Sequence, residues 1–427
     1  MTFNTKNDEA WAHLFSKYRI LDKINCEECF HITAGQINEF REARLMTKFD
    51  HRVNLPEIFY RNNLAILPTA RGSYVISHFE AYENLSPIDD GIVAVSFPDY
   101  IESIDHENIT SEAIALSCAY LSGILADFLE DDNLFPTVSG RMGSGNFSFF
   151  IERQSGKRDF KVEVNKAQIE IDGGFEGLKQ LALIEAKNFI SEDFIIRQLY
   201  YPYRLWNSKT SKDIIPIYMV YSNGLFSLYQ YAFKNPDCYN SLVLVKARRY
   251  SLDVEEVVFA DLVDVFKVTQ VVEEPRLAFP QADNFKRIIN LCELLFENDM
   301  TRDDITLNYA FDPRQTNYYT DAGRYLGLID KRRDEGQVVY SLTDGGENII
   351  QSRYKERQLG FVKSILEHRV FNEVFRFYVR NNEMPAKKNI IQIMRNANLY
   401  RIKADSTYTR RASTVASWVN WVVELPG

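Results

Sequence analysis

The sequence predicts an α/β protein with a mixed central sheet flanked by helices, followed by a largely helical C-terminal region. Two observations support this. From Phe147 onward, short runs rich in Val, Ile, Phe and Tyr follow one another, which is typical of strands. From Phe285 onward, apolar residues recur every three or four positions, which is typical of helices that face a core.

The length of 427 residues favours two or three domains. We expect an N-terminal α/β region at residues 1–110, packed on the core and without an assigned role, and an α/β core at residues 111–275. A helical segment with two strands follows at 280–352, and a purely helical segment at 353–427. Residues 268–283 contain two prolines and few periodic apolar positions, so they predict a linker.

The sequence predicts the helices, loops and strands of the core in chain order. Residues 111–130 predict a helix capped by Ser111, and the glycine-rich residues 140–146 predict a loop. Acids at the start of 191–206 predict a helix that Pro202 ends or kinks. The remaining runs predict strands at 147–152, 160–164, 167–172, 181–187, 214–223 and 224–233, the last two joined by a hairpin turn at Asn223-Gly224.

The composition argues against a membrane protein or a secreted one. No apolar run approaches the ~18 residues that a membrane helix needs, and the first residues are polar and acidic, unlike a signal peptide. We therefore expect a cytoplasmic protein without membrane contact. The five cysteines predict free thiols. Cys26 and Cys29 form a CxxC, but no second pair follows, so two half-buried thiols are favoured over a zinc site.

Charge is distributed unevenly along the chain. The net charge is −9, but residues 351–427 hold 14 basic and 6 acidic residues, a net of +8, so the remainder carries −17. A basic C-terminal segment on an acidic body is compatible with nucleic-acid binding, and equally with a solvated basic face.

One group of residues in the predicted core is a candidate catalytic site. Asp172 ends one predicted strand, and Glu185 and Lys187 end the next. Residues i and i+2 of a strand share a face, so Glu185 and Lys187 project side by side. A turn between the strands can return the chain and place Asp172 opposite Glu185. Mg²⁺ prefers such oxygen ligands, and a lysine adds positive charge where a phosphoryl transition state gathers negative charge.

This pattern resembles the D…ExK signature of the PD-(D/E)xK nuclease superfamily. The wider phrase IDGGFEG…LIEAKN, followed by RQLYYPYR, is similar to type II restriction endonucleases, and the match covers roughly residues 110–270. The resemblance implies a restriction-endonuclease-like fold in which Asp172, Glu185 and the Ala186 carbonyl bind Mg²⁺. It implies Lys187 as the residue that positions water. Ile171 stands where the family's proline would be.

Other residues near the signature are weaker candidates. Some relatives keep a glutamine near the active site on the following helix, where this chain has Gln198. A further acid could come from Glu163, Glu170 or Glu176, although solvated positions are the more common outcome for each. The glycine-rich segment places Arg141, Ser144 and Asn146 where a loop could enter a DNA groove, and Arg71-Gly72-Ser73 invites a similar interpretation. A plain connecting loop fits equally well.

The C-terminal segments predict DNA contacts by a winged helix at 280–352 and a helix-turn-helix-like element at 353–427. The alternative is a winged helix that contacts protein or packs on the catalytic domain. Helix, helix, helix, strand, turn, strand is the winged-helix order, and Asp312-Pro313 predicts the start of its third helix. One face of that helix would carry Tyr318, Ala322, Tyr325 and Leu326 toward the core. The opposite face would carry Arg314, Asn317, Asp321 and Arg324, where a recognition helix contacts bases. Further phosphate contacts are predicted at the basic wing residue Arg332, beside Lys331 and Arg333, and at Arg410 and Arg411 of the last helix.

The sequence therefore predicts a sequence-specific type II restriction endonuclease that hydrolyses double-stranded DNA with Mg²⁺. By resemblance we expect a homodimer, since each core cuts one strand, and a cognate DNA methyltransferase in the same system. A methylation-dependent or repair nuclease is one alternative. A DNA-binding regulator with a catalytically dead core is another, although the intact lysine argues against it.

Overall fold

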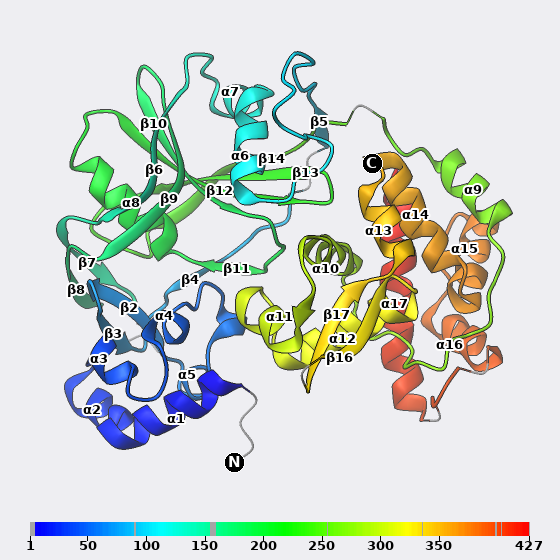
Figure 1. Cartoon of the computed structure of the whole chain (residues 1–427), viewed down its shortest axis with the longest axis horizontal. Helices are drawn as coiled ribbons and strands as arrows, with labels where there is room; N and C mark the ends of the chain where they lie inside the picture. Colours follow the sequence, from blue (N-terminus) through cyan, green and yellow to red (C-terminus); the bar gives the residue numbers. More distant parts are fainter. Residues whose placement is uncertain are drawn as a thin grey trace. The chain divides into compact units, whose positions relative to one another are not determined.

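The structure is a computed structural model that describes residues 5–88, 91–153, 159–253, 255–334, 336–397, 399–402 and 404–426. It is a mixed α/β protein with several sheets and a largely helical C-terminal region (Figure 1). The chain divides into two compact units. Unit 1 comprises Met1–Asp90, Ser111–Tyr221 and Phe226–Tyr250, and unit 2 comprises Gly91–Thr110, Ser222–Leu225 and Ser251–Gly427. No helix among the described residues is long and apolar enough to cross a membrane.

The helices of unit 1 are short. They are α1 (Lys6–Tyr18), α2 (Ile20–Glu27), α3 (Ala34–Ile37), α4 (Ala43–Met46), the 3-10 helix η1 (Arg52–Asn54), α5 (Glu57–Arg61), α6 (Glu112–Leu121), α7 (Ile124–Leu129) and α8 (Arg197–Asn207). Its first strands are β1 (Phe30–Thr33), β2 (Ala65–Ala70), β3 (Ser73–Ser77) and β4 (Tyr82–Asn84). The later strands are β6 (Phe135–Gly143), β7 (Asn146–Ile151), β8 (Phe160–Asn165), β9 (Gln168–Glu176), β10 (Gln180–Lys187), β11 (Asp193–Ile195), β12 (Asp213–Ser222), β13 (Leu225–Phe233) and β14 (Leu242–Ser251).

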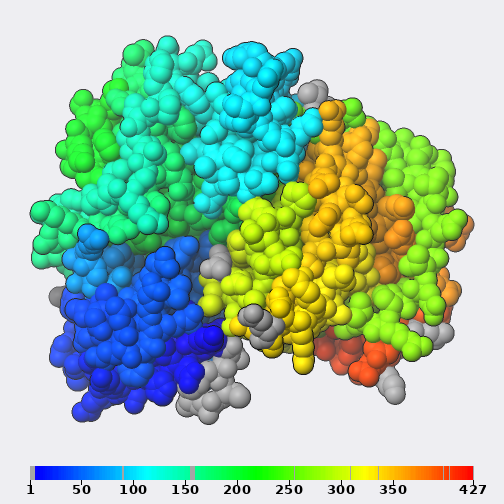
Figure 2. Space-filling model, in the orientation of Figure 1, coloured from blue at the N-terminus to red at the C-terminus, as the bar shows by residue number. Residues whose placement is uncertain are grey.

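Two mixed sheets organise unit 1. The smaller has the strand order β1-β3-β2-β8-β7, so the N-terminal strands and those preceding the candidate site share one sheet. The blue N-terminal residues lie directly beside the teal strand residues in Figure 2. The larger sheet includes the order β14-β13-β12-β10-β9-β6, in which β10 runs parallel to β12 and antiparallel to β9. A separate pair joins β11 to β4.

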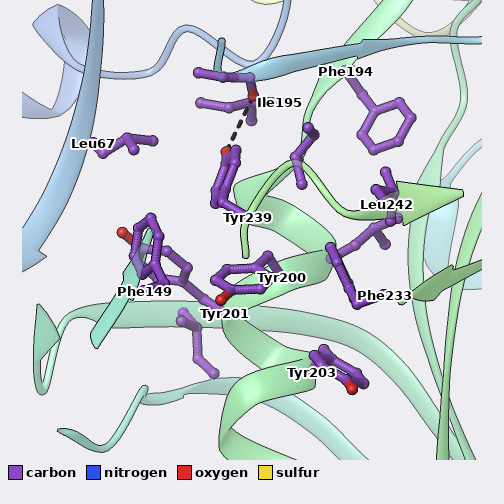
Figure 3. Close-up of a cluster of buried hydrophobic side chains, with 14 of the residues drawn as sticks. Leu67, Phe149, Phe194, Ile195, Tyr200, Tyr201, Tyr203, Phe233, Tyr239 and Leu242 are labelled. Atoms are coloured by element: carbon purple, nitrogen blue, oxygen red, sulfur yellow. Dashed lines mark hydrogen bonds between the residues drawn. The ribbon is translucent and has the colours of Figure 1, made fainter. Parts of the chain in front are cut away.

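Aromatic side chains fill the core between these strands and α8. Figure 3 shows this cluster, in which Tyr200, Tyr201 and Tyr239 gather around Phe149. The Tyr239 hydroxyl donates to the Ala81 carbonyl (3.1 Å), so its polar end is satisfied. The cluster includes residues of β2 and β3 as well as of β9 and β10, so the N-terminal region and the strands of the candidate site share one hydrophobic core.

Unit 2 contains β5 (Ile92–Ala94) and the C-terminal elements. Its helices are α9 (Phe259–Val268), α10 (Phe285–Glu297), α11 (Arg302–Asn308), α12 (Pro313–Tyr325), α13 (Asp344–Gln351), α14 (Tyr354–Leu366), α15 (Arg369–Asn381), α16 (Lys387–Asn396) and α17 (Asp405–Val423). Its strands β15 (Met300–Thr301), β16 (Ile329–Asp334) and β17 (Gln337–Leu342) form a sheet in the order β15-β17-β16. As predicted, Asp312 caps α12 by accepting hydrogen bonds from two backbone N–H groups, and α9 and α10 are joined without regular structure.

Several sequence predictions for unit 1 are confirmed. Ser111 caps α6 by accepting from the Ile114 N–H, and the expected strands are present as β7 to β10, β12 and β13. The Asn223-Gly224 turn has positive φ at both residues (54° and 72°), the conformation that Asn-Gly favours in hairpins.

Three predictions for unit 1 are wrong. The helix expected at 111–130 is interrupted at Gly123, whose φ of 82° a helix does not accommodate. The helix expected at 191–206 begins only at Arg197, because residues 193–195 form β11 against β4. Of the two outcomes expected at Pro202, an end of the helix is excluded, because α8 continues to Asn207. The loop expected at 140–146 is mostly strand, because β6 extends to Gly143 and pairs with β9.

Candidate functional site

Asp172, Glu185 and Lys187 meet where β9 and β10 lie side by side in unit 1. Ile184 of β10 pairs with Gly173 of β9, so the antiparallel register brings Asp172 level with Glu185. The Ala186 N–H donates to Asp172 Oδ2 (2.8 Å). The predicted return of the second strand toward Asp172 is therefore confirmed by the geometry.

Lys187 folds back onto the two neighbouring oxygens of its own strand. Its Nζ donates to Glu185 Oε1 (2.5 Å) and to the Ala186 carbonyl (3.0 Å). Both side chains are buried, with about a tenth of each exposed (10%/10%). The ammonium therefore lies between two of the three oxygens that the sequence hypothesis assigns to a metal ion.

Gln198 reaches the same carboxylate from α8. Its Nε2 donates to Glu185 Oε1 (2.5 Å), while its Oε1 is buried and has no hydrogen-bond partner among the described residues. The predicted proximity of Gln198 to the cluster is thus confirmed. An unpartnered buried amide oxygen in a native site calls for a donor or a cation.

Burial dominates the protonation of the pair. It raises the pKa of Glu185 to about 8, because removal from water penalises the ionised carboxylate, although the charge of Lys187 lowers it. For Lys187 burial is the largest single influence and lowers the pKa, but the charges of Glu185, Tyr218, Glu112 and Asp172 together outweigh it, so the pKa of Lys187 is raised. Lys187 therefore remains an ammonium at neutral pH, and Glu185 is the group that exchanges a proton.

Glu112 is a further acid that the sequence analysis missed. It opens α6, and burial raises the pKa of its carboxyl, with Lys187 lowering it and Asp172 raising it. A hydrogen bond from the backbone of Asn188 also lowers it. Glutamate is common in the first turn of any helix, so nothing in the sequence distinguished Glu112.

Two glycines of β9 allow neighbouring elements to approach the strand closely. A Cβ on Gly173 would lie 2.4 Å from Leu116 Cδ2 of α6, and a Cβ on Gly174 would lie 2.7 Å from Val138 Cβ of β6. Side chains at these positions would displace both neighbours. Gly173 therefore permits the close packing of α6, the helix that begins at Glu112, and Gly174 permits that of β6.

The three further acids that the sequence offered as candidates form ion pairs outside the cluster. Glu163 pairs with Lys161, Glu170 with Arg141, and Glu176 with Lys212. Arg141 is exposed on β6 rather than in a loop, and Asn146 is exposed at the start of β7. Ser144 is buried, and its hydroxyl donates to the Gly145 carbonyl (3.1 Å), so this side chain is not available to DNA in this conformation.

The donor set of the cluster is made of oxygens. Asp172, Glu185 and the Ala186 carbonyl suit a hard divalent cation that keeps several waters. No group of three or more His, Cys, Asp or Glu side chains within the described part of the chain is arranged to hold a metal by itself. Cys29 is half-buried as predicted, but the prediction is wrong for Cys26, which is exposed.

In unit 2, α12 largely follows the predicted division of faces. Ala322, Tyr325 and Leu326 are buried, but Tyr318 is half-buried and Tyr319 takes the inward position instead. The polar side chains Arg314 and Asn317 are exposed, Asp321 and Arg324 are half-buried and paired with each other (3.1 Å), and Lys331, Arg332 and Arg333 are exposed on β16.

The last helix, α17, presents one exposed and one half-buried arginine. Arg410 is exposed, and burial lowers the pKa of the half-buried Arg411, as does the charge of Arg410. Ala412, Val415 and Val422 are buried, and so is Thr414, whose hydroxyl donates to Asp283 Oδ1 (2.5 Å).

Comparison with known families gives domains without an assigned function. Three models of domains of unknown function match the chain: DUF6996 over residues 8–76, DUF6997 over 77–251 and DUF7226 over 287–427. No curated protein and no solved structure matches it. The cluster of Asp172, Glu185 and Lys187 lies within the second of these domains.

Proposed function

We propose that this protein is a Mg²⁺-dependent, sequence-specific DNA endonuclease of the type II restriction class. The observation that carries the proposal is the convergence of Asp172, Glu185 and Lys187 on adjacent antiparallel strands, with Gln198 on the following helix. Metal-dependent hydrolysis of a phosphodiester uses groups of this kind: two carboxylates, a backbone carbonyl and a buried ammonium.

The arrangement of neighbouring elements agrees with a PD-(D/E)xK core. The strands β9 and β10 form an antiparallel pair, β12 extends the sheet in parallel to β10, and α8 follows the signature. This is the strand and helix setting that the sequence resemblance implies. The finer assignment of unit 1 as restriction-endonuclease-like is part of this proposal.

Each residue of the cluster has a defined task. Asp172, Glu185 and the Ala186 carbonyl would hold Mg²⁺, and Glu112 adds a further acid that interacts electrostatically with Lys187 and Asp172. Bound Mg²⁺ supplies an acidified water and polarises a phosphoryl oxygen. Lys187 as an ammonium orients the attacking water and stabilises the negative charge that develops on the phosphate. Gln198 fixes the Glu185 carboxylate by donating to it.

Unit 2 supports DNA as the substrate. The elements α10, β15, α11, α12, β16 and β17 follow one another in winged-helix order. Arg314 and Asn317 are exposed on α12, and these residue types read guanine and adenine. Arg332 on the wing is exposed, although it pairs with Asp299 (2.6 Å) and must exchange this partner for phosphate. A homodimer, one core for each strand, and a protecting DNA methyltransferase belong to the same proposal.

The test is plasmid digestion in Mg²⁺ with and without EDTA. The wild type should give discrete fragments that disappear with EDTA and with Lys187→Ala. Lys161→Ala is a matched control, because Lys161 is exposed and forms an ion pair with Glu163, away from the cluster. Thermal melting of both variants distinguishes a loss of catalytic activity from a loss of the folded structure. Normal cutting by Lys187→Ala would overturn the site.

Parallel digestion of methylated and unmethylated plasmid resolves the class of nuclease. Cutting confined to unmethylated DNA supports the restriction class with a protecting methyltransferase. Cutting confined to methylated DNA would replace that class with a methylation-dependent one, while leaving the catalytic cluster assigned.

A further inference from the structure

The N-terminal region reaches the candidate site through one short segment, residues 48–52. Its backbone is tied to β11 at several points. The Ile195 N–H donates to the Asp50 carbonyl (2.9 Å), and the His51 Nδ1 lies 2.5 Å from the Asp193 carbonyl. The Arg52 N–H donates to the Asp193 carboxylate (3.2 and 3.4 Å).

Side chains reinforce this attachment. The Arg52 guanidinium donates to Asn84 Oδ1 (2.6 Å) and to the Tyr82 carbonyl (3.1 Å), both on β4, the partner strand of β11. His51 is buried (2% exposed) against the ring of Phe189, two residues beyond Lys187. Residues 48–52 are therefore held in one place relative to the end of β10.

The segment also carries charge to the cluster. Asp50 Oδ1 lies 3.9 Å from the Arg197 guanidinium, and Arg197 precedes Gln198, the residue that donates to Glu185. The charge of Asp50 raises the pKa of the Glu185 carboxyl. The charge of Lys48 lowers the pKa of Glu112, as does that of Lys187, whereas that of Asp172 raises it. The N-terminal region thus supplies one acid and one base to the surroundings of the cluster.

Lys48 differs from the other charged residues there in its exposure. Lys187 is buried and committed to Glu185 and Ala186, whereas Lys48 is exposed and forms no ion pair within 4.0 Å with the described residues. The cluster and its surroundings hold four acidic side chains, those of Asp172, Glu185, Glu112 and Asp50. A phosphate backbone approaching such a surface needs a compensating cation, and a lysine serves as a point charge for phosphate.

We propose that Lys48 binds a phosphate of the DNA strand that passes the cluster, and that residues 48–52 form a part of the active site contributed by the N-terminal region. This inference rests on the proposed nuclease function. It gives a role to a region that the sequence analysis left unassigned. It also means that the site spans two of the matched domains, the one over residues 8–76 and the one over 77–251.

The test uses the full chain and three variants: Lys48→Ala, Lys48→Arg and the control Lys23→Ala. Lys23 is also exposed in the N-terminal region, but it lies over the ring of Phe30 (5.0 Å). Binding of a fluorescent 30-base-pair duplex of arbitrary sequence is measured in Ca²⁺ over a series of salt concentrations. Plasmid cleavage is measured in Mg²⁺.

Loss of one phosphate contact should lower the slope of log Kd against log salt by about 1 for Lys48→Ala. Cleavage should fall about tenfold, the effect of removing one charge-assisted hydrogen bond. Lys48→Arg should restore most of both, and Lys23→Ala should match the wild type. Equal slopes and equal cleavage for Lys48→Ala and Lys23→Ala would overturn the inference.

The two readouts separate the inference from the proposed function. If the wild type fails to cut but the salt slope still falls for Lys48→Ala, the nuclease function is lost and the phosphate contact stands. If the wild type cuts and Lys48→Ala behaves as the control in both assays, the contact is lost and the nuclease function stands.

Discussion

Metal binding at the cluster should depend steeply on pH, because the proposed ligand Glu185 is buried. Burial raises its pKa to about 8 from the usual 4.5. A cation needs the ionised carboxylate, so the proton must leave before metal binds. Metal affinity should rise with pH up to about 8, whereas the metal-free fold should lose stability from about pH 4.5 to 8, because the unfolded chain releases this proton first.

The size of the effect follows from the same pKa. Glu185 would be ionised in about one molecule in a hundred at pH 6 and in about half of the molecules at pH 8. The apparent affinity should therefore increase about 50-fold between these values, which corresponds to ~2 kcal/mol. Nearly one proton should be released per metal bound at pH 6, and about half a proton at pH 8.

Isothermal titration calorimetry with Mn²⁺, a cation suited to carboxylate ligands, measures both quantities. Titrations in two buffers of different ionisation enthalpy give the number of protons released. Lys187→Met should shift the dependence to higher pH, because the charge of Lys187 lowers the pKa of Glu185. Equal Mn²⁺ affinity at pH 6 and pH 8, without proton release, would refute the assignment of Glu185 as a buried metal ligand.

Three further outcomes are expected. Gln198→Ala should lower the cleavage rate about tenfold in a plasmid assay, because it removes a charge-assisted hydrogen bond to Glu185 worth ~1.5 kcal/mol, and unchanged cleavage would argue against its role. Asn317→Ala should weaken binding to the cognate site by ~1–3 kcal/mol and leave non-specific binding unchanged in a fluorescence anisotropy assay, a result that equal losses on both DNAs would contradict. Gly346→Ala should destabilise unit 2 by about 1–3 kcal/mol in thermal melting, because its Cβ would lie 2.3 Å from the Leu328 carbonyl oxygen, and an unchanged melting temperature would show that the backbone yields.

Local patterns in the sequence were sufficient for the centre of the site. Alternating apolar residues identified β9, a short run of strand-like residues identified β10, and the spacing of Asp172 from Glu185 matched a turn and a return strand. The Asp-Pro start of α12 was likewise read correctly, because a capping side chain and a proline at the first helical position act within a few residues.

Features that depend on distant segments were not predictable. Residues 193–195 form β11 because β4 supplies the partner strand, and acids near the start of the segment suggested a helix instead. Arg141 belongs to a strand because β9 pairs with it, while the flanking glycines suggested a loop. In each case the competing local signal was real, and tertiary pairing outweighed it.

The same reasoning explains why Lys48 and Glu112 escaped notice although both act on the cluster. Along the chain Glu112 precedes Asp172 by 60 residues (172 − 112) and Lys48 precedes it by 124 (172 − 48). Folding brings Glu112 near because Gly173 lets α6 approach, and it brings Lys48 near because Asp193 holds residues 48–52 on β11. Their types carry no signal of their own, since exposed lysines and first-turn glutamates are common. A site assembled in this way depends on the shared core of the N-terminal strands and α8. Deleting residues 5–76 should therefore cost the chain its core as well as Lys48, which is why the point variant is the more informative experiment.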